Sequence, residues 1–237
     1  VQVISLSATV SNAEEFGGWM QTVRGDTTVV VDEHRPVPLW QHVLVGNRLF
    51  DLFDYRATKA GKSKRELLVD PDLLRHIAHR READRLSDWQ PRGRGRSGHR
   101  GRPTMYRPPS RPDVIAALDR EGLLPAITFI FSRAGCDAAV KQCLRSSLRL
   151  TTDEERAAIA EVVERRCGEL PESDLIVLDY HEWREGLLRG LAAHHAGMLP
   201  VFRHTVEELF SAGLVKAVFA TETLALGINL PARTVVL

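Results

Sequence analysis

Short apolar segments alternate with amphipathic helical segments through the second half of the chain, and this alternation restricts the fold more strongly than any other feature of the sequence. Segments typical of strands cover 126–131, 175–178 and 216–220, and another begins near Arg233. Segments typical of helices cover 113–121, 134–144, 153–167 and 200–213. Strands that alternate with helices are joined by right-handed crossovers, so the pattern predicts an α/β fold with a parallel sheet and helices on both of its faces.

The start of the chain has the same order of strand, polar tip and helix. Residues 1–6 are apolar and rich in β-branched side chains, and Ser11 or Asn12 can cap a helix over about 13–20. The chain also closes in an apolar segment. We therefore expect the sequence to be an internal piece of a longer protein, cut through buried strands at both ends.

Extended backbone is predicted between this first unit and the middle of the chain. Residues 27–31 and 37–45 have the composition of strands, and Pro36 and Pro38 exclude a helix between them. We assign 1–31 to the end of a first domain, with a connector over the next 22 or so residues, 32–53.

Neither strand-like nor helix-like patterns of apolar residues are found from 54 to 112. Arginine dominates this stretch, few carboxylates face it after Asp72, and residues 92–102 are a low-complexity run of arginine and glycine. Like charges repel one another, and no apolar burial offsets the entropy of ordering, so we predict a basic, disordered insertion. Such segments either bind single-stranded RNA through charge and arginine stacking or are solvated filler, and the sequence leaves both interpretations open.

Composition excludes several classes of protein. The formal net charge is +1, 43% of residues are hydrophobic, and no apolar run approaches the roughly 18 residues of a membrane span. The three cysteines, Cys136, Cys143 and Cys167, have no CxxC spacing, so we expect reduced thiols, no metal site and a cytoplasmic protein without a membrane partner.

Ligands of parallel α/β sheets bind outside the carboxyl ends of the strands. Four polar loops occupy this position, where loops enter helices: 7–9, 132–133, 194–200 and 221–229. They supply hydroxyls, backbone amides, an arginine and glycines, which suit the recognition of phosphate. That phosphate can belong to a nucleotide or to a nucleic acid.

Four motifs in these loops give the chain a resemblance to a known family. The sequence LSAT at 6–9 is similar to helicase motif III, FIFSR at 129–133 to motif IV, HHAGMLP at 194–200 to the HHxGxLP block, and FATETLALGINLPA at 219–232 to motif V. The order of the motifs, with RPVP at 35–38 similar to an interdomain connector, resembles the superkiller-type DExH-box RNA helicases of superfamily 2, which are linked to the exosome. The excess of arginine over lysine is typical of a GC-rich bacterial, actinobacterial-like member.

The resemblance implies two RecA-like lobes of the P-loop NTPase class, the second at 113–237 and truncated before motif VI. It implies that Ser7 and Thr9 couple the ATP site to unwinding, and that Gly227 and Asn229 approach the nucleotide. Neither a GxxxxGK[ST] loop nor a DExH box occurs in the chain. We therefore expect ATP with Mg²⁺ as the cofactor of the whole protein, ligands for Mg²⁺ outside this sequence, and no ATP hydrolysis by the chain alone.

The resemblance also implies that one RNA strand is held through its phosphates by Ser132, Arg133, the backbone of Gly197, and Thr221. Contacts of this kind give affinity without sequence choice. The expected activity is 3′ to 5′ translocation along RNA, with single-stranded or partly duplex RNA as the substrate and RNA-decay nucleases as partners.

Simpler interpretations stand beside these. Ser132 is also a suitable helix cap, and Arg133 can be a solvated surface charge. His194 and His195 can be residues that shape their loop rather than bind metal. At the level of the whole protein, the alternatives are a non-catalytic RNA-binding scaffold with a helicase fold and a DNA-active relative. The 2′-hydroxyl distinguishes RNA from DNA.

Overall fold

The structure of the protein is a computed structural model. It describes residue 4 and residues 12–32, 37–55, 68–88, 108–171, 178–222 and 231–237, with the side chains of 83–88 left out. The chain divides into two units, Val1–Gln41 and His42–Leu237, which are considered separately.

The described part of the first unit is a helix followed by extended chain. Helix α1 spans Ala13–Arg24, four residues longer than the sequence predicts, and Asn12 caps it by accepting a hydrogen bond from the backbone N–H of Glu15. Gly17 lies so close to Val29 that a Cβ atom there would stand 2.3 Å from a methyl of Val29. The helix and the extended segment therefore pack against each other.

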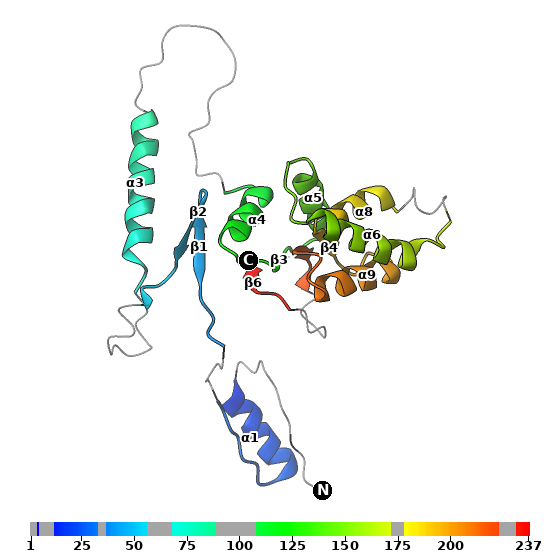
Figure 1. Ribbon diagram of the computed structural model, residues 1–237. Coiled ribbons are helices and arrows are strands. Elements are labelled where there is room, and N and C mark those ends of the chain that lie inside the picture. The colour runs from blue at the N-terminus through cyan, green and yellow to red at the C-terminus, as the bar shows by residue number, and fades with distance from the viewer. Residues whose placement is uncertain are drawn as a thin grey trace. The chain divides into compact units, whose positions relative to one another are not determined.

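The second unit begins with a hairpin and a helix where the sequence predicts a connector and a disordered insertion. Strands β1 (His42–Val45) and β2 (Arg48–Asp51) pair antiparallel, and helix α3 spans Pro71–Asp88 (Figure 1). The Asp70 carboxylate caps α3, and Leu73 is buried against the hairpin. The prediction of a disordered segment is thus wrong for this helix, while residues 89–107 lie outside the described part.

The main sheet confirms the predicted α/β class. Its four parallel strands are β3 (Ala126–Phe129), β4 (Leu191–His194), β5 (Ala217–Ala220) and β6 (Thr234–Val236), in the order β4-β5-β3-β6. Three of them match segments at 126–131, 216–220 and near Arg233 that the sequence predicts as strands. The candidate strand at 175–178 falls largely outside the described residues.

Helices cover both faces of this sheet (Figure 1). Helices α4 (Arg111–Arg120) and α5 (Arg133–Leu144) enclose one core, and α6 (Asp153–Cys167), α8 (Tyr180–Leu188) and α9 (Pro200–Ser211) enclose the other. The side chains of Val218 and Phe219, neighbours on β5, are fully buried in opposite cores. This alternation is what a strand buried on both faces requires.

Capping fixes where several of these helices begin. At α6 the Thr152 hydroxyl accepts a hydrogen bond from the N–H of Glu155, whose carboxylate accepts one from the N–H of Thr152. Ser110 and Asp113 form the same reciprocal pair at α4. Each pair satisfies backbone donors that the helix itself cannot.

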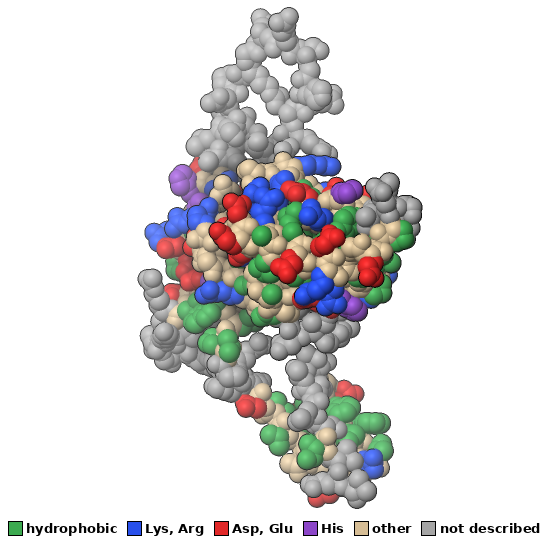
Figure 2. All heavy atoms as spheres, turned by 45° about the vertical axis from the view of Figure 1, so that its right-hand side comes forward, with side chains coloured by type: hydrophobic (Ala, Val, Ile, Leu, Met, Phe, Trp, Pro, Cys, Tyr) green, Lys and Arg blue, Asp and Glu red, His purple; other side chains and the backbone are tan. Residues whose placement is uncertain are grey.

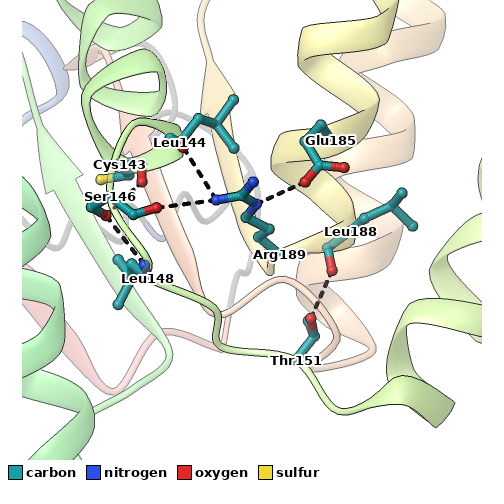
Figure 3. A network of polar contacts seen from close by, with 8 residues as sticks. All are labelled: Cys143, Leu144, Ser146, Leu148, Thr151, Glu185, Leu188 and Arg189. Carbon is teal, nitrogen blue, oxygen red and sulfur yellow. Dashed lines mark hydrogen bonds and ion pairs between the residues drawn. The ribbon is translucent and has the colours of Figure 1, made fainter.

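A polar network joins α5, α8 and the segment between α5 and α6 (Figure 3). The Arg189 guanidinium donates to the carboxylate of Glu185 at 2.8 Å and to the backbone oxygens of Leu144 and Ser146 at 3.2 Å. The buried Thr151 hydroxyl donates to the Leu188 oxygen at 2.7 Å. These contacts fix the end of α5 and the segment after it against the end of α8.

All three cysteines are free and buried on α5 or α6, and burial raises the pKa of the Cys136 and Cys143 thiols to about 11. Within the described residues, no helix is both long enough and apolar enough to cross a membrane.

Candidate nucleic-acid interface

The first residues of three of the four predicted polar loops meet at the carboxyl edge of the sheet. In the strand register, Ala220 is the partner of both Phe129 and His194, so the ends of β3, β4 and β5 lie side by side. The loops at 132–133 and 194–200, together with Thr221, leave the sheet at this edge. The fourth loop, with Ser7 and Thr9, lies outside the described residues, as do Gly227 and Asn229.

Ser132 and Arg133 occupy the start of α5. Ser132 caps this helix, because its hydroxyl oxygen accepts a hydrogen bond of 3.0 Å from the backbone N–H of Gly135. Its hydroxyl proton remains able to donate outward, since both residues are exposed. Arg133 is the first residue of the helix and places its positive charge at the edge. The helix-cap interpretation of Ser132 is confirmed, and it is compatible with a phosphate contact.

His195 organises the loop after β4. Its Nδ1 atom accepts a hydrogen bond of 3.2 Å from the backbone N–H of Gly197, and its Nε2 atom lies 3.0 Å from a carboxylate oxygen of Asp137 on α5. Because Nδ1 accepts, the ring proton is on Nε2, which donates to Asp137. The ring is almost completely buried. The interpretation of His195 as a residue that shapes its loop agrees with this geometry.

The hydrogen bond from Gly197 to His195 bears on the predicted contact between the Gly197 backbone and phosphate. The sequence predicts that the Gly197 backbone holds phosphate, but its N–H is directed at His195 in this structure. A Cβ at this position would stand 3.1 Å from Cδ of Arg133 and 3.2 Å from Nδ1 of His195. The absence of a side chain at Gly197 therefore allows the Arg133 side chain to lie close against the loop. The Gly197 N–H, which is predicted to bind phosphate, already donates to His195.

His194 and Thr221 connect β4 to the loop after β5. The Thr221 N–H donates to the backbone oxygen of His194 at 3.2 Å, and His194 Nε2 lies 2.8 Å from the carboxylate of Glu207 on α9. The other ring nitrogen of His194 is buried and has no hydrogen-bond partner in the described part of the chain. The edge is thus braced by two histidine–carboxylate pairs, one to α5 and one to α9.

Sequence reasoning missed both carboxylate partners, Asp137 and Glu207. Asp137 is 58 residues from His195, and nothing in the spacing indicates that α5 brings it to the loop. Glu207 is only 13 residues from His194, one strand-to-helix connection away. The side chain of Phe131, the residue before Ser132, is fully exposed, which the motif pattern does not indicate.

A cavity of about 290 Å³ opens behind the loop, between α5, α8 and α9. Trp183 and Phe202 line it and stack with ring centroids 4.2 Å apart, while Lys141 at its rim pairs with Glu182 at 2.9 Å. That hydrogen bond raises the pKa of the Lys141 ammonium above its ordinary value. Among the described residues, no three side chains of the metal-binding kinds are grouped to hold an ion.

Charge on the surface does not by itself mark a binding face. On the face drawn in Figure 2, lysine and arginine side chains alternate with aspartate and glutamate side chains over the helices of the second unit. No extended field of one sign covers that face. The feature that suits phosphate is therefore the set of loops at the strand ends, rather than the overall charge of this face.

Comparison with known proteins gives the following relatives. The whole chain is 78% identical to part of "Probable helicase HelY" of Mycobacterium tuberculosis, over 237 residues that make up 25% of that protein. It is 37% identical over 259 residues to "DExH-box ATP-dependent RNA helicase DExH15 chloroplastic" of Arabidopsis thaliana, and 37% identical over 244 residues to human "Superkiller complex protein 2". These alignments include all of this chain and cover 21% and 18% of the two relatives.

The chain spans about a quarter of the length of its mycobacterial relative. No family model matches the sequence.

Proposed function

This chain belongs to the superkiller-type DExH-box helicases of superfamily 2, and we propose that it forms part of an ATP-dependent RNA helicase that moves 3′ to 5′ along one strand. In this proposal residues 1–31 belong to the first RecA-like lobe, 32–53 to the connector, and 113–237 to most of the second lobe. The protein would act in the cytoplasm on single-stranded or partly duplex RNA, with RNA-decay nucleases as its partners.

The observation that supports this proposal most is the meeting of three loops at one sheet edge. Ser132 offers a hydroxyl, Arg133 a permanent charge, and Thr221 lies at the end of the neighbouring strand. Groups of this kind bind the phosphates of a nucleic acid without reading its bases, as movement along any sequence requires. Ser7 and Thr9 would connect this edge to the ATP site, and Gly227 and Asn229 would approach the nucleotide.

ATP bound with Mg²⁺ supplies the free energy for strand separation through hydrolysis of its terminal phosphate. This chain supplies the surface that holds the strand. Each turnover would alternate between a state that grips the RNA and one that releases it.

Strand displacement by the full-length protein tests the proposal. We expect ATP-dependent separation of an RNA duplex that carries a 3′ single-stranded tail, and little separation of the same duplex with a 5′ tail. Arg133→Ala should reduce displacement at low RNA concentration, whereas Arg145→Ala, which removes an arginine from the opposite end of α5, is the matched control. Equal displacement from both tails, or none, would contradict the proposed activity.

A further inference from the structure

The peptide group between Ala196 and Gly197 directs its N–H at the His195 ring and its carbonyl the other way. The Ala196–Gly197 bond is trans, so the Gly197 N–H and the Ala196 carbonyl point in opposite directions. The N–H is directed at the buried His195 ring. The carbonyl oxygen of Ala196 is therefore directed away from that ring, in a loop where both residues are exposed.

This oxygen is available to a ligand. Within the described part of the chain it accepts no hydrogen bond. Arg133 lies against the same peptide, with its Cδ atom 3.1 Å from where a Cβ of Gly197 would stand. The Arg133 side chain thus contacts Gly197, the residue that directly follows this carbonyl.

A carbonyl oxygen repels a phosphate and attracts a hydrogen-bond donor. Along the sugar–phosphate backbone of a nucleic acid, the donor present in RNA and absent from DNA is the ribose 2′-hydroxyl. We propose, on the basis of the proposed function, that the Ala196 carbonyl accepts a hydrogen bond from a 2′-hydroxyl, and that His195 is the positioning residue that turns the peptide to present it. Asp137 fixes the ring tautomer that makes Nδ1 an acceptor.

Three substitutions at His195 separate its two hydrogen bonds. In His195→Asn the side-chain oxygen stands near the place of Nδ1 and can accept from Gly197. In His195→Gln the side-chain amide reaches toward Asp137 but leaves Gly197 without its acceptor. His195→Ala removes both bonds. If orientation of the peptide is what matters, only the asparagine variant keeps the wild-type behaviour.

The measurement is the ratio of Kd for single-stranded DNA to Kd for RNA of the same sequence, using the full-length protein. We expect the preference for RNA to fall by about 2- to 10-fold in the glutamine and alanine variants, the effect of one lost hydrogen bond, and to persist in the asparagine variant. An equal change in RNA and DNA affinity in all three variants would overturn the proposal, since it would indicate a phosphate contact or a purely structural role.

A second measurement needs no variant. RNA with 2′-fluoro groups keeps the ribose pucker but has no hydroxyl proton, so the wild-type protein should bind it about 2- to 10-fold more weakly than RNA. Equal binding would overturn the inference. These outcomes are distinct from failure of the proposed function, which would be seen as absent strand displacement by the wild-type protein.

Discussion

At the scale of single residues, the carboxyl edge of the sheet combines structural and binding roles in the same side chains. Ser132 caps α5 and is also predicted to hold a phosphate. His195 is buried and makes two hydrogen bonds, so it shapes the loop rather than binding a ligand directly. The motifs predict that Ser132, Arg133 and Thr221 lie at the edge, whereas Asp137 and Glu207 reach it through tertiary packing that no local spacing encodes. Ser7, Thr9, Gly227 and Asn229 lie outside the described residues.

Substitutions at Ser132 separate its two roles. Ser132→Asp keeps an oxygen that can cap α5 but places a negative charge beside the expected phosphate, so thermal stability should be retained while RNA affinity falls. Ser132→Ala should lower stability by about 1 kcal/mol, the typical value of a cap. Thermal denaturation and RNA titration measure the two effects. If the aspartate variant bound RNA as tightly as the wild type, Ser132 would be only a cap.

Thr221 is predicted to touch RNA rather than the terminal phosphate of ATP. In the full-length protein, Thr221→Ala should therefore lower RNA-stimulated ATP turnover several-fold and leave basal turnover within about 2-fold, because only an interaction with RNA is removed. Thr221→Ser keeps the hydroxyl and serves as the control. Equal losses of basal and stimulated turnover would exclude this assignment.

At the scale of elements, alternating apolar and amphipathic segments predict β3, β5, β6 and the helices α4, α5, α6 and α9, since each pattern follows directly from burial on one or two faces. Strand β4 and helix α8 are not among the predicted elements. Helix α3 was not predicted. Its highly charged sequence gives no apolar pattern, although Asp70 caps the helix and Leu73 packs against the hairpin that precedes it. α1 also continues past Met20 to end before Gly25, where φ is +85°.

An ion-pair group ties α6 to α9 and makes stability depend on pH. Glu208 on α9 accepts from Arg166 at 2.6 Å and also pairs with Arg165. The hydrogen bond from Arg166 is the main cause that holds the pKa of the Glu208 carboxyl below its ordinary value. The contribution of these ion pairs to the free energy of unfolding is present above the ordinary pKa of the carboxyl. It is lost as the pH falls through the lowered pKa of Glu208.

Glu208→Gln should thus reduce the free energy of unfolding by about 0.5–1 kcal/mol near pH 7, in the range of exposed pairs. The difference from wild type should disappear in acid, below the lowered pKa. Denaturant unfolding at several pH values measures this, with Glu161→Gln, an exposed carboxylate on α6, as the control. A difference that persisted unchanged in acid would rule out the ion pairs as its cause.

At the scale of the whole molecule, the second unit provides a sheet edge where residues predicted to bind phosphate converge, and the chain represents about a quarter of its mycobacterial relative. The phosphate-binding loop and the Mg²⁺ ligands that the family requires are predicted outside this sequence. The arginine-rich stretch at 92–102 remains the part whose role the sequence leaves open.

Deletion of 92–102 from the full-length protein separates the two interpretations of that stretch. The melting temperature should change by less than about 2 °C, because charged low-complexity sequence contributes little packing. If the stretch binds RNA, the deletion should also make RNA affinity less sensitive to salt, since fewer counterions are released. A large fall in melting temperature would show that the stretch belongs to an ordered element.

ATP hydrolysis by the full-length protein tests most directly whether the chain is part of an ATP-dependent RNA helicase. It is measured without nucleic acid and with single-stranded RNA or single-stranded DNA at equal concentration. A helicase whose second lobe holds RNA through this edge should hydrolyse ATP slowly alone, much faster with RNA, and less with DNA. Absence of hydrolysis in folded protein would contradict the account and favour a scaffold, and equal stimulation by DNA would contradict its choice of RNA.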